Sequence, residues 1–224
     1  MNFDDYPETR KKIFLASCKL FFQKCYADVG IREIAVEAGV KVPTVYNHYP
    51  SKEAILLDLL QFYEERLLQF QARFNCIDYD KDPVKCFREM AFAYEDIEID
   101  LMRQLMRIVF TEQHRSAQAA KIVFDISMRA AKENYYHFLL HLKNKGVIQC
   151  EAIDSFAEVF ARIGITFAMQ YVRDDEIRQR PDYYVILMDL FDLILHYLPP
   201  HLREEQGREN GENAQSQTLT QTPG

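Results

Sequence analysis

Apolar residues recur at helical spacing along most of the chain, and glycine or proline interrupts this pattern at short intervals. The run from Ile13 to Phe21 follows the spacing and predicts a first helix over about residues 9–24. Between residues 31 and 38, apolar side chains fall at i, i+3, i+4 and i+7, which predicts a second, shorter helix. No stretch combines the strict alternation of a strand with turn residues. The pattern therefore predicts an all-α protein.

The stretch from residue 31 to residue 53 predicts two short helices joined by a sharp turn and followed by a longer helix. Gly39 follows the last apolar position of the first helix, where glycine readily takes the left-handed backbone that ends a helix. Pro43 favours the start of the second helix, because the first turn does not use its missing N–H. Ser51 predicts the N-cap of the long helix. Such a pair of helices is typical of the helix-turn-helix, but also of an ordinary helical corner.

The residues of this stretch favour the first interpretation. It closely resembles the DNA-binding motif of the TetR family of bacterial transcriptional regulators, and the matching residues are Ala35, Ala38, Gly39, Val40, Thr44, Tyr46, His48, Tyr49, Ser51, Lys52 and Glu53. Two positions depart from the family pattern. Cys25 stands where the family usually has glycine, and Gly30 stands where a Ser or Thr usually caps the next helix. Glycine is a tolerable N-cap, so this departure puts one phosphate contact in doubt and leaves the fold intact.

The resemblance implies that the second short helix reads DNA. Tyr46 and Lys52 match positions that contact phosphates, and Arg32 is placed to reach a guanine edge. Val42 and Pro43 carry no hydrogen-bond donor, so we expect them to contact only a thymine methyl group. The expected DNA-binding residues are Arg32, Lys41, Val42, Pro43, Thr44, Tyr46, Asn47, His48 and Lys52.

The distribution of charge agrees with this expectation although the net charge of the chain is −7. Residues 9–53 contain eight Lys or Arg and four acidic residues, which gives this part +4 and leaves −11 for the rest. A basic N-terminal part can meet phosphates while the acidic remainder is repelled, which orients the approach to DNA.

The rest of the chain predicts a helical body. Apolar periodicity continues to about residue 74, resumes after Pro83, and defines further helices over about 100–112 and about 117–145, the last ending at Gly146. Residues 76–82 lack the period and predict a loop. We expect a helix-turn-helix domain over residues 1–53, an effector-binding and dimerisation domain over 54–200, and a polar, disordered tail over 201–224.

Two last helices are expected over about residues 151–173 and 182–198. The first carries a stripe of small residues, and the second is apolar on most of its sides and must bury more than one surface. Burial within one chain explains this, and so does a second chain. The resemblance favours the second chain, because TetR-like proteins dimerise through their last two helices. The expected interface residues are Phe156, Ala157, Phe160, Ala161, Gly164, Phe167, Ala168, Tyr183, Leu187, Leu190, Phe191 and Ile194.

The body also offers apolar side chains for a ligand pocket, although core packing explains each of them equally well. The resemblance favours the pocket, because TetR-like regulators bind a small-molecule effector in the helical body. Methionines adapt to varied shapes, so we expect an apolar or amphipathic effector. The expected pocket residues are Met102, Met106, Phe110, Phe124, Met128, Tyr135 and Phe138.

The sequence offers little to other kinds of chemistry. The chain has seven glycines and no G-x-G pair, so phosphate-binding loops of the common nucleotide-binding types are not expected. His137 and His141 lie four residues apart, but half-buried polar side chains explain them better than a metal does. Arg103 and Arg107 are similarly spaced and favour salt bridges over an anionic ligand. No catalytic residue, cofactor, spanning segment or signal peptide is expected, so the chain is predicted to be cytoplasmic.

Together these features predict a homodimeric, ligand-responsive transcriptional regulator, a repressor in preference to an activator, that binds a palindromic site in double-stranded DNA. A helical enzyme is one alternative and would need a convergent set of acid, base or metal ligands. A helical ligand-binding or adaptor protein without DNA binding is the other.

Overall fold

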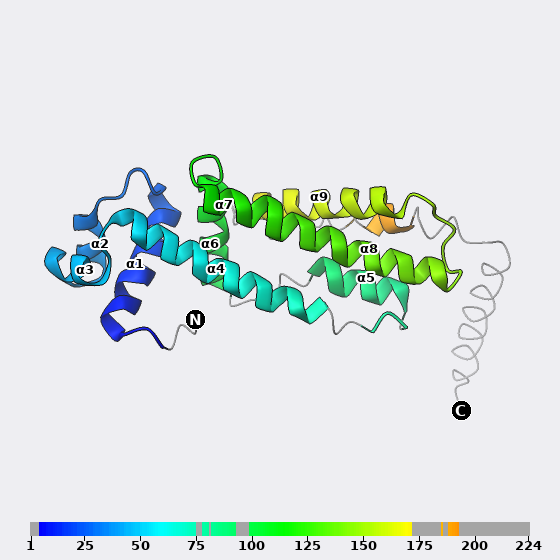
Figure 1. Ribbon diagram of the computed structural model, residues 1–224, viewed down its shortest axis with the longest axis horizontal. Helices are drawn as coiled ribbons and strands as arrows, with labels where there is room; N and C mark the ends of the chain where they lie inside the picture. Colours follow the sequence, from blue (N-terminus) through cyan, green and yellow to red (C-terminus); the bar gives the residue numbers. More distant parts are fainter. Residues whose placement is uncertain are drawn as a thin grey trace, which may run out of the picture.

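The computed structural model describes residues 5–74, 78–80, 82–92, 99–171, 185 and 188–192. Every element in these ranges is helical, which confirms the all-α prediction. The elements are α1 (Glu8–Lys24), α2 (Ile31–Glu37), α3 (Val42–His48), α4 (Lys52–Phe74), α5 (Pro83–Phe92), α6 (Ile99–Glu112), α7 (Ala117–Lys121), a π-helical segment η2 (Ile122–Met128), α8 (Arg129–Asn144) and α9 (Ile153–Tyr171). In the elongated molecule, α1 to α3 form one end, here called the head, and α4 extends from it toward α5, α8 and α9 (Figure 1).

The helix ends lie where local backbone chemistry predicts them. Gly39 after α2 and Gly146 after α8 have positive φ angles of 67° and 73°, the left-handed conformation that glycine adopts without a steric cost. Ser51 caps α4, since its hydroxyl accepts a hydrogen bond from the backbone N–H of Ala54 at 3.1 Å. Pro43 lies in the first turn of α3. These ends confirm the predicted order of short helix, turn, short helix and long helix.

The predicted helix over residues 117–145 is not a single α-helix. It begins as α7, continues as the π-helical segment η2 and becomes α helical again in α8. Within η2 the buried Ser127 donates its hydroxyl proton to the carbonyl of Ile122, five residues earlier, at 2.8 Å. Apolar periodicity predicts that this region is helical, but it does not distinguish a wider turn from an α turn.

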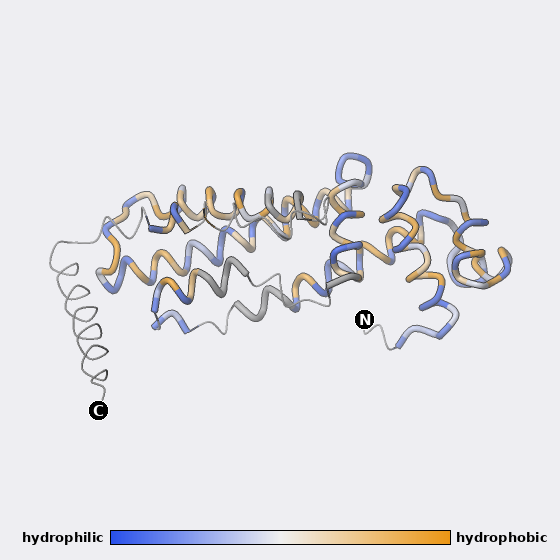
Figure 2. Tube along the Cα trace, turned by 180° about the vertical axis from the view of Figure 1, so that it is seen from behind, coloured by the Kyte–Doolittle hydropathy of each residue, from blue (hydrophilic) through white to orange (hydrophobic). Residues whose placement is uncertain are grey.

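The hydrophobic interior consists of two clusters. The first joins α1 to α4 with α6, α7 and η2, and includes Phe14, Leu59 and Leu105. The second joins α5, α8 and α9, and its rings pack closely, with Phe87 and Phe191 stacked at 4.1 Å between centroids. Along the helices at both ends of the molecule, hydrophobic residues are interspersed with hydrophilic ones (Figure 2). The first cluster runs across the expected domain boundary after residue 53, and that boundary stays a prediction.

Several predicted features lie outside the described residues. They are most of the final helix over 182–198, with Tyr183, Leu187 and Ile194, and the tail over 201–224. Phe167 lies in α9, but its side chain is outside the description. No helix among the described residues is both long and apolar enough to cross a bilayer.

Cys25, directly after α1, has a backbone that suits glycine. Its φ of 68° and ψ of 155° lie in a region that residues with a Cβ rarely adopt, and it is the described non-glycine residue with a positive φ. Its N–H still closes α1 by donating to the carbonyl of Phe21 at 3.0 Å. Cys25 therefore carries backbone strain that a glycine at this position would not have.

We expect the free energy of unfolding of Cys25→Gly to be about 1–3 kcal/mol higher than that of Cys25→Ala, because both variants lose the thiol but only glycine removes the strain that a Cβ imposes at this φ and ψ. Urea denaturation followed by circular dichroism measures the difference. Equal stability of the two variants would show that the backbone at this position is not strained.

Candidate DNA-binding site

Helix α3 presents one face to the protein and the other to solvent. Val45 is fully buried and Tyr49, the residue after α3, is 3% exposed, so both hold the helix against the first cluster. The outer face carries Lys41, Pro43, Tyr46 and Asn47, and all four are exposed. An exposed polar face on a short helix that the core holds firmly is the arrangement a major-groove reading helix requires.

The other residues expected around α3 are less accessible. Val42 is partly buried and packs against the first cluster, so only part of its side chain remains for a base. Thr44 and His48 are also partly exposed. Val42, at the start of α3, thus packs against the first cluster and is also partly accessible at the surface.

Helix α2 is fastened to α1 by two ion pairs. Lys24 pairs with Glu33 at 2.8 Å, and Lys19 pairs with Glu37 at 2.5 Å. The hydrogen bond from Lys24 lowers the pKa of Glu33, helped by the backbone N–H of Gly30, which donates to the same carboxylate at 2.9 Å. Gly30 is the N-cap as predicted, and it has no side chain to accept from the N–H of Glu33, which donates to the Gly30 carbonyl at 3.0 Å instead. Arg32 stays exposed at the start of α2.

Lys52 makes contacts that its sequence position did not predict. Its ammonium donates to the backbone carbonyls of Tyr26 at 2.8 Å, Val29 at 2.9 Å and Ala27 at 3.4 Å, and it lies 4.3 Å from the centre of the Tyr26 ring. These bonds use all three of its N–H donors. Lys52 thus ties the turn between α1 and α2 to the start of α4. Its expected phosphate contact stays a prediction, and it would compete with these bonds.

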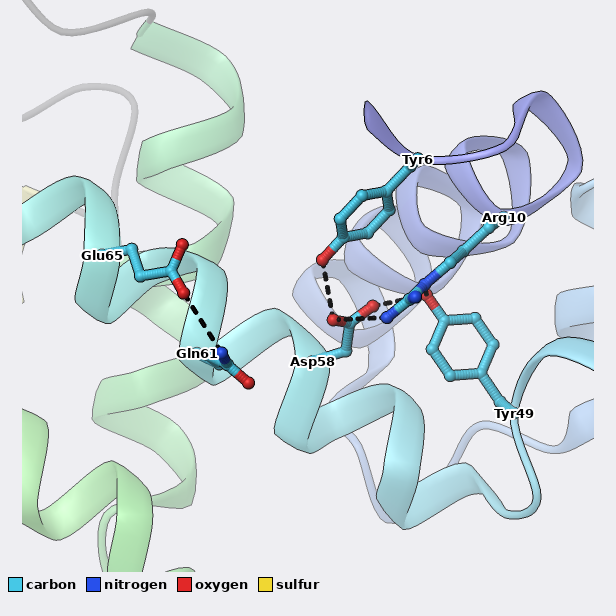
Figure 3. A network of polar contacts seen from close by, with 6 residues as sticks. All are labelled: Tyr6, Arg10, Tyr49, Asp58, Gln61 and Glu65. Atoms are coloured by element: carbon cyan, nitrogen blue, oxygen red, sulfur yellow. Dashed lines mark hydrogen bonds and ion pairs between the residues drawn. The ribbon is translucent and has the colours of Figure 1, made fainter. Parts of the chain in front are cut away.

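A polar network joins α1, α3 and α4 (Figure 3). The carboxylate of Asp58 on α4 accepts from Tyr6 at 2.7 Å, from Tyr49 at 2.5 Å and from Arg10 at 3.0 Å. The Arg10 guanidinium also donates to the Tyr49 hydroxyl at 3.2 Å. Burial, followed by the hydrogen bond to Asp58, raises the pKa of both tyrosines, so their hydroxyls stay protonated and donate.

Sequence patterns did not point to this network, but one clue was present. Asp58 interrupts the apolar run AILLDLL at the start of α4, and a charged residue there requires a partner. Arg10 is followed by Lys11 and Lys12 in the sequence, and the spacing of these three cations does not indicate which of them meets Asp58.

The expected pocket residues do not form one group. Met102 and Met106 are buried in the first cluster, and Phe110 packs against it. The second cluster contains or contacts Met128, Tyr135 and Phe138. Phe124, on η2, is 56% exposed. The structure therefore brings together two separate sets, and the pocket stays a prediction.

The expected interface residues also divide into two groups. Ala157, Phe160, Ala161 and Phe191 are fully buried within one chain, so their burial needs no partner. The partly exposed residues of the set are Phe156, Gly164, Ala168 and Leu190. Among the described residues, a Cβ at Gly164 would meet no heavy atom within 4 Å, apart from its own helix backbone and neighbours. The face of α9 at Gly164 is thus open toward the part of the chain that the structure describes.

The remaining candidates have other surroundings. The guanidinium groups of Arg103 and Arg107 both lie over the ring of Phe22 on α1, at 5.3 Å and 4.7 Å from its centre, and their expected salt bridges stay a prediction. His141 lies 3.3 Å from Asp80, while His137 is exposed. The described residues contain no group of three or more possible metal ligands.

Comparison with known proteins supports the helix-turn-helix. Residues 13–59 match the family described as bacterial regulatory proteins, tetR family. YuxN, an uncharacterised HTH-type transcriptional regulator of Bacillus subtilis, is 33% identical over 91 residues, which cover 40% of this chain and 31% of YuxN. The chain thus spans about a third or less of the first curated relatives it matches.

Solved structures resemble the chain over most of its length. A bacterial regulatory protein of the tetR family from Rhodococcus RHA1 gives a TM-score of 0.61 at 18% identity, covering 86% of this chain and 98% of its own. A protein from Saccharomonospora viridis, described as a transcriptional regulator and solved in complex with choline, gives 0.55 at 20% identity, covering 76% and 96%.

The fold and the exposed face of α3 define the class: an all-helical protein with an N-terminal helix-turn-helix and a helical body. Residues 13–59 match the model of the tetR family of bacterial regulatory proteins, and the chain as a whole has a fold similar to that of solved proteins of that family. This confirms the resemblance seen in the sequence.

Replacing Lys52 with methionine tests its role in the head. Lys52→Met keeps the aliphatic stem but leaves three carbonyls without their donor, so we expect the free energy of unfolding to fall by about 1–3 kcal/mol. The control is Lys24→Met, which breaks an exposed ion pair and should cost under about 1 kcal/mol. Urea denaturation measures both. Equal losses would mean that the three bonds to carbonyls contribute no more than a surface pair.

Proposed function

We propose that the chain is a transcriptional regulator that binds double-stranded DNA through the exposed face of α3 and the start of α2. The observation that carries this proposal is the exposed row of Lys41, Pro43, Tyr46 and Asn47 on a helix whose other side the core fixes. The match of residues 13–59 to the tetR family supports it. The regulator acts in the cytoplasm, where its DNA lies.

The contacts divide into anchors and readers. Tyr46, which is 52% exposed, donates its hydroxyl to a phosphate and so anchors the helix on any sequence. Arg32 and Asn47 reach base edges, where a guanidinium pairs with guanine and an amide with adenine. Pro43, and the accessible part of Val42, contact a thymine methyl group. Thr44, His48 and the charges of Lys41 and Lys52 complete the surface that faces the backbone.

We further propose that two chains pair through α9 and the final helix, so that two heads bind a palindrome with half-sites about one helical turn apart or a multiple of it. The open face at Gly164 supports this pairing, because a partner helix can approach a glycine closely. The fully buried residues of the set, such as Ala161 and Phe191, support the interface from beneath.

The helical body binds a small-molecule effector, and the protein is a repressor that this effector releases. The helical neighbour that was solved with choline supports a small-molecule role for such a body. The buried methionines and rings of the body favour an apolar or amphipathic effector.

Selection of bound duplexes from random DNA, followed by two variants, tests the division of roles. Arg32→Ala should lose about 1–3 kcal/mol of discrimination between the selected duplex and a random one. Tyr46→Phe should weaken binding to both duplexes by the same factor, since it removes a phosphate contact. Fluorescence anisotropy titrations at fixed salt measure both. Identical effects of the two variants would contradict the assignment, and failure to select any sequence would contradict DNA reading itself.

Filling the open face of α9 tests the dimer. Gly164→Leu should raise the dimer dissociation constant about tenfold or more, because overpacking a helix contact costs about 1–3 kcal/mol. It should not harm the single chain, since leucine is a better helix former than glycine. Thr166→Leu, on a different side of α9, is the control. Sedimentation equilibrium measures the association, and an unchanged dissociation constant for Gly164→Leu would place the interface elsewhere.

A further inference from the structure

The Asp58 network joins the start of α1 and the end of α3 to a single carboxylate on α4. Tyr6 precedes α1, Arg10 lies in its first turns, and Tyr49 directly follows α3. All three side chains converge on the Asp58 carboxylate (Figure 3). The side chain of Asp58 is only 10% exposed and that of Arg10 is 30% exposed, so water competes little for these bonds. The Cζ atom of Arg10 also lies 4.3 Å from the centre of the Tyr6 ring and 5.3 Å from the centre of the Tyr49 ring.

Tyr49 connects this network to the reading helix. Its backbone N–H donates to the carbonyl of Val45 at 2.9 Å and so closes α3, while its hydroxyl binds Asp58. Apart from Val45 and Tyr49, no residue of the stretch from Val42 to Tyr49 is buried. A helix of two turns with so few buried side chains can pivot on an apolar contact, because hydrophobic burial has no preferred direction. A hydrogen bond does have one.

We propose that Asp58 is a positioning residue for DNA recognition, because its carboxylate fixes the orientation of α3 on α4 through Tyr49. This inference rests on the proposed DNA binding. Asp58 does not touch DNA in this scheme. It determines whether Arg32 on α2 and Asn47 on α3 meet their base edges together.

The ionised carboxylate is suited to this role in a way that an amide is not. It accepts from two hydroxyls and a guanidinium at once, and it balances the charge of Arg10. In Asp58→Asn the side-chain NH₂ would face donors. The isosteric change therefore keeps the volume of the side chain but leaves one acceptor oxygen for three donors and removes the charge, which weakens its hold on Tyr49.

The experiment compares affinity for two probes, a duplex selected from random DNA by the wild-type protein and a random duplex of equal length. For Asp58→Asn we expect the ratio of the two affinities to fall about tenfold, because the charge-assisted bond from Tyr49, at the end of α3, is lost. Affinity for the random duplex should stay nearly constant, since it depends on phosphate charge. Asp28→Asn makes the same charge change in the exposed turn after α1 and should leave the ratio unchanged.

Two tyrosine variants separate positioning from general stability. Tyr49→Phe removes the bond from α3 and should lower the ratio as Asp58→Asn does. Tyr6→Phe removes a similar bond from outside α3 and should leave the ratio within about twofold. All titrations are made at a temperature where circular dichroism shows each variant folded.

An unchanged ratio for Asp58→Asn and Tyr49→Phe, with only a lower melting temperature, would overturn the proposal and leave Asp58 a purely structural residue. An equal fall for Tyr6→Phe would also overturn it. If the wild-type protein selects no sequence, the proposed function fails instead, which is a distinguishable result.

Discussion

The burial of α4 is the constraint on which the rest of the structure depends. Ile55, Leu59 and Leu60 are at most 1% exposed and belong to the same cluster as Phe14 of α1 and Leu105 of α6. Burying one such side chain contributes about 1.5–3 kcal/mol, so the head cannot leave α4 without losing several of these contacts. The head is therefore packed on α4, and α3 takes its position from this helix.

Polar contacts on the same helix supply the direction that apolar packing lacks. Lys52 at its start holds the turn before α2 through three carbonyls, and Asp58 holds Tyr49 after α3. Lys52 and Asp58 both lie in the first two turns of α4. Lys52 holds α2 near the beginning of that helix, and Asp58 holds α3 at its end. A short helix-turn-helix with little interior of its own gains a defined orientation from this arrangement.

Sequence analysis predicted the features that local chemistry determines. Gly39, Pro43 and Ser51 mark helix ends because backbone conformation and capping act over a few residues. The roles of Lys52 and Asp58 depend on partners as many as 26 and 52 residues away, and no periodicity reports such pairs. The π-helical segment η2 was not predicted, because over seven residues the apolar spacing of a π-helix cannot be told from that of an α-helix. Apolar spacing also shows that Met106 and Phe138 are buried, but it does not show that they belong to different clusters.

We propose that α3 meets DNA with its outer face while its inner face stays packed on α4. Hydrogen–deuterium exchange of the full chain with a selected duplex tests this most directly. With the selected duplex we expect slower exchange in peptides covering residues 31–49. With a random duplex at high salt we expect no such slowing, because phosphate contacts alone are weak under that condition. Unchanged exchange over residues 31–49, with protection confined to α5, α8 or α9, would contradict the account.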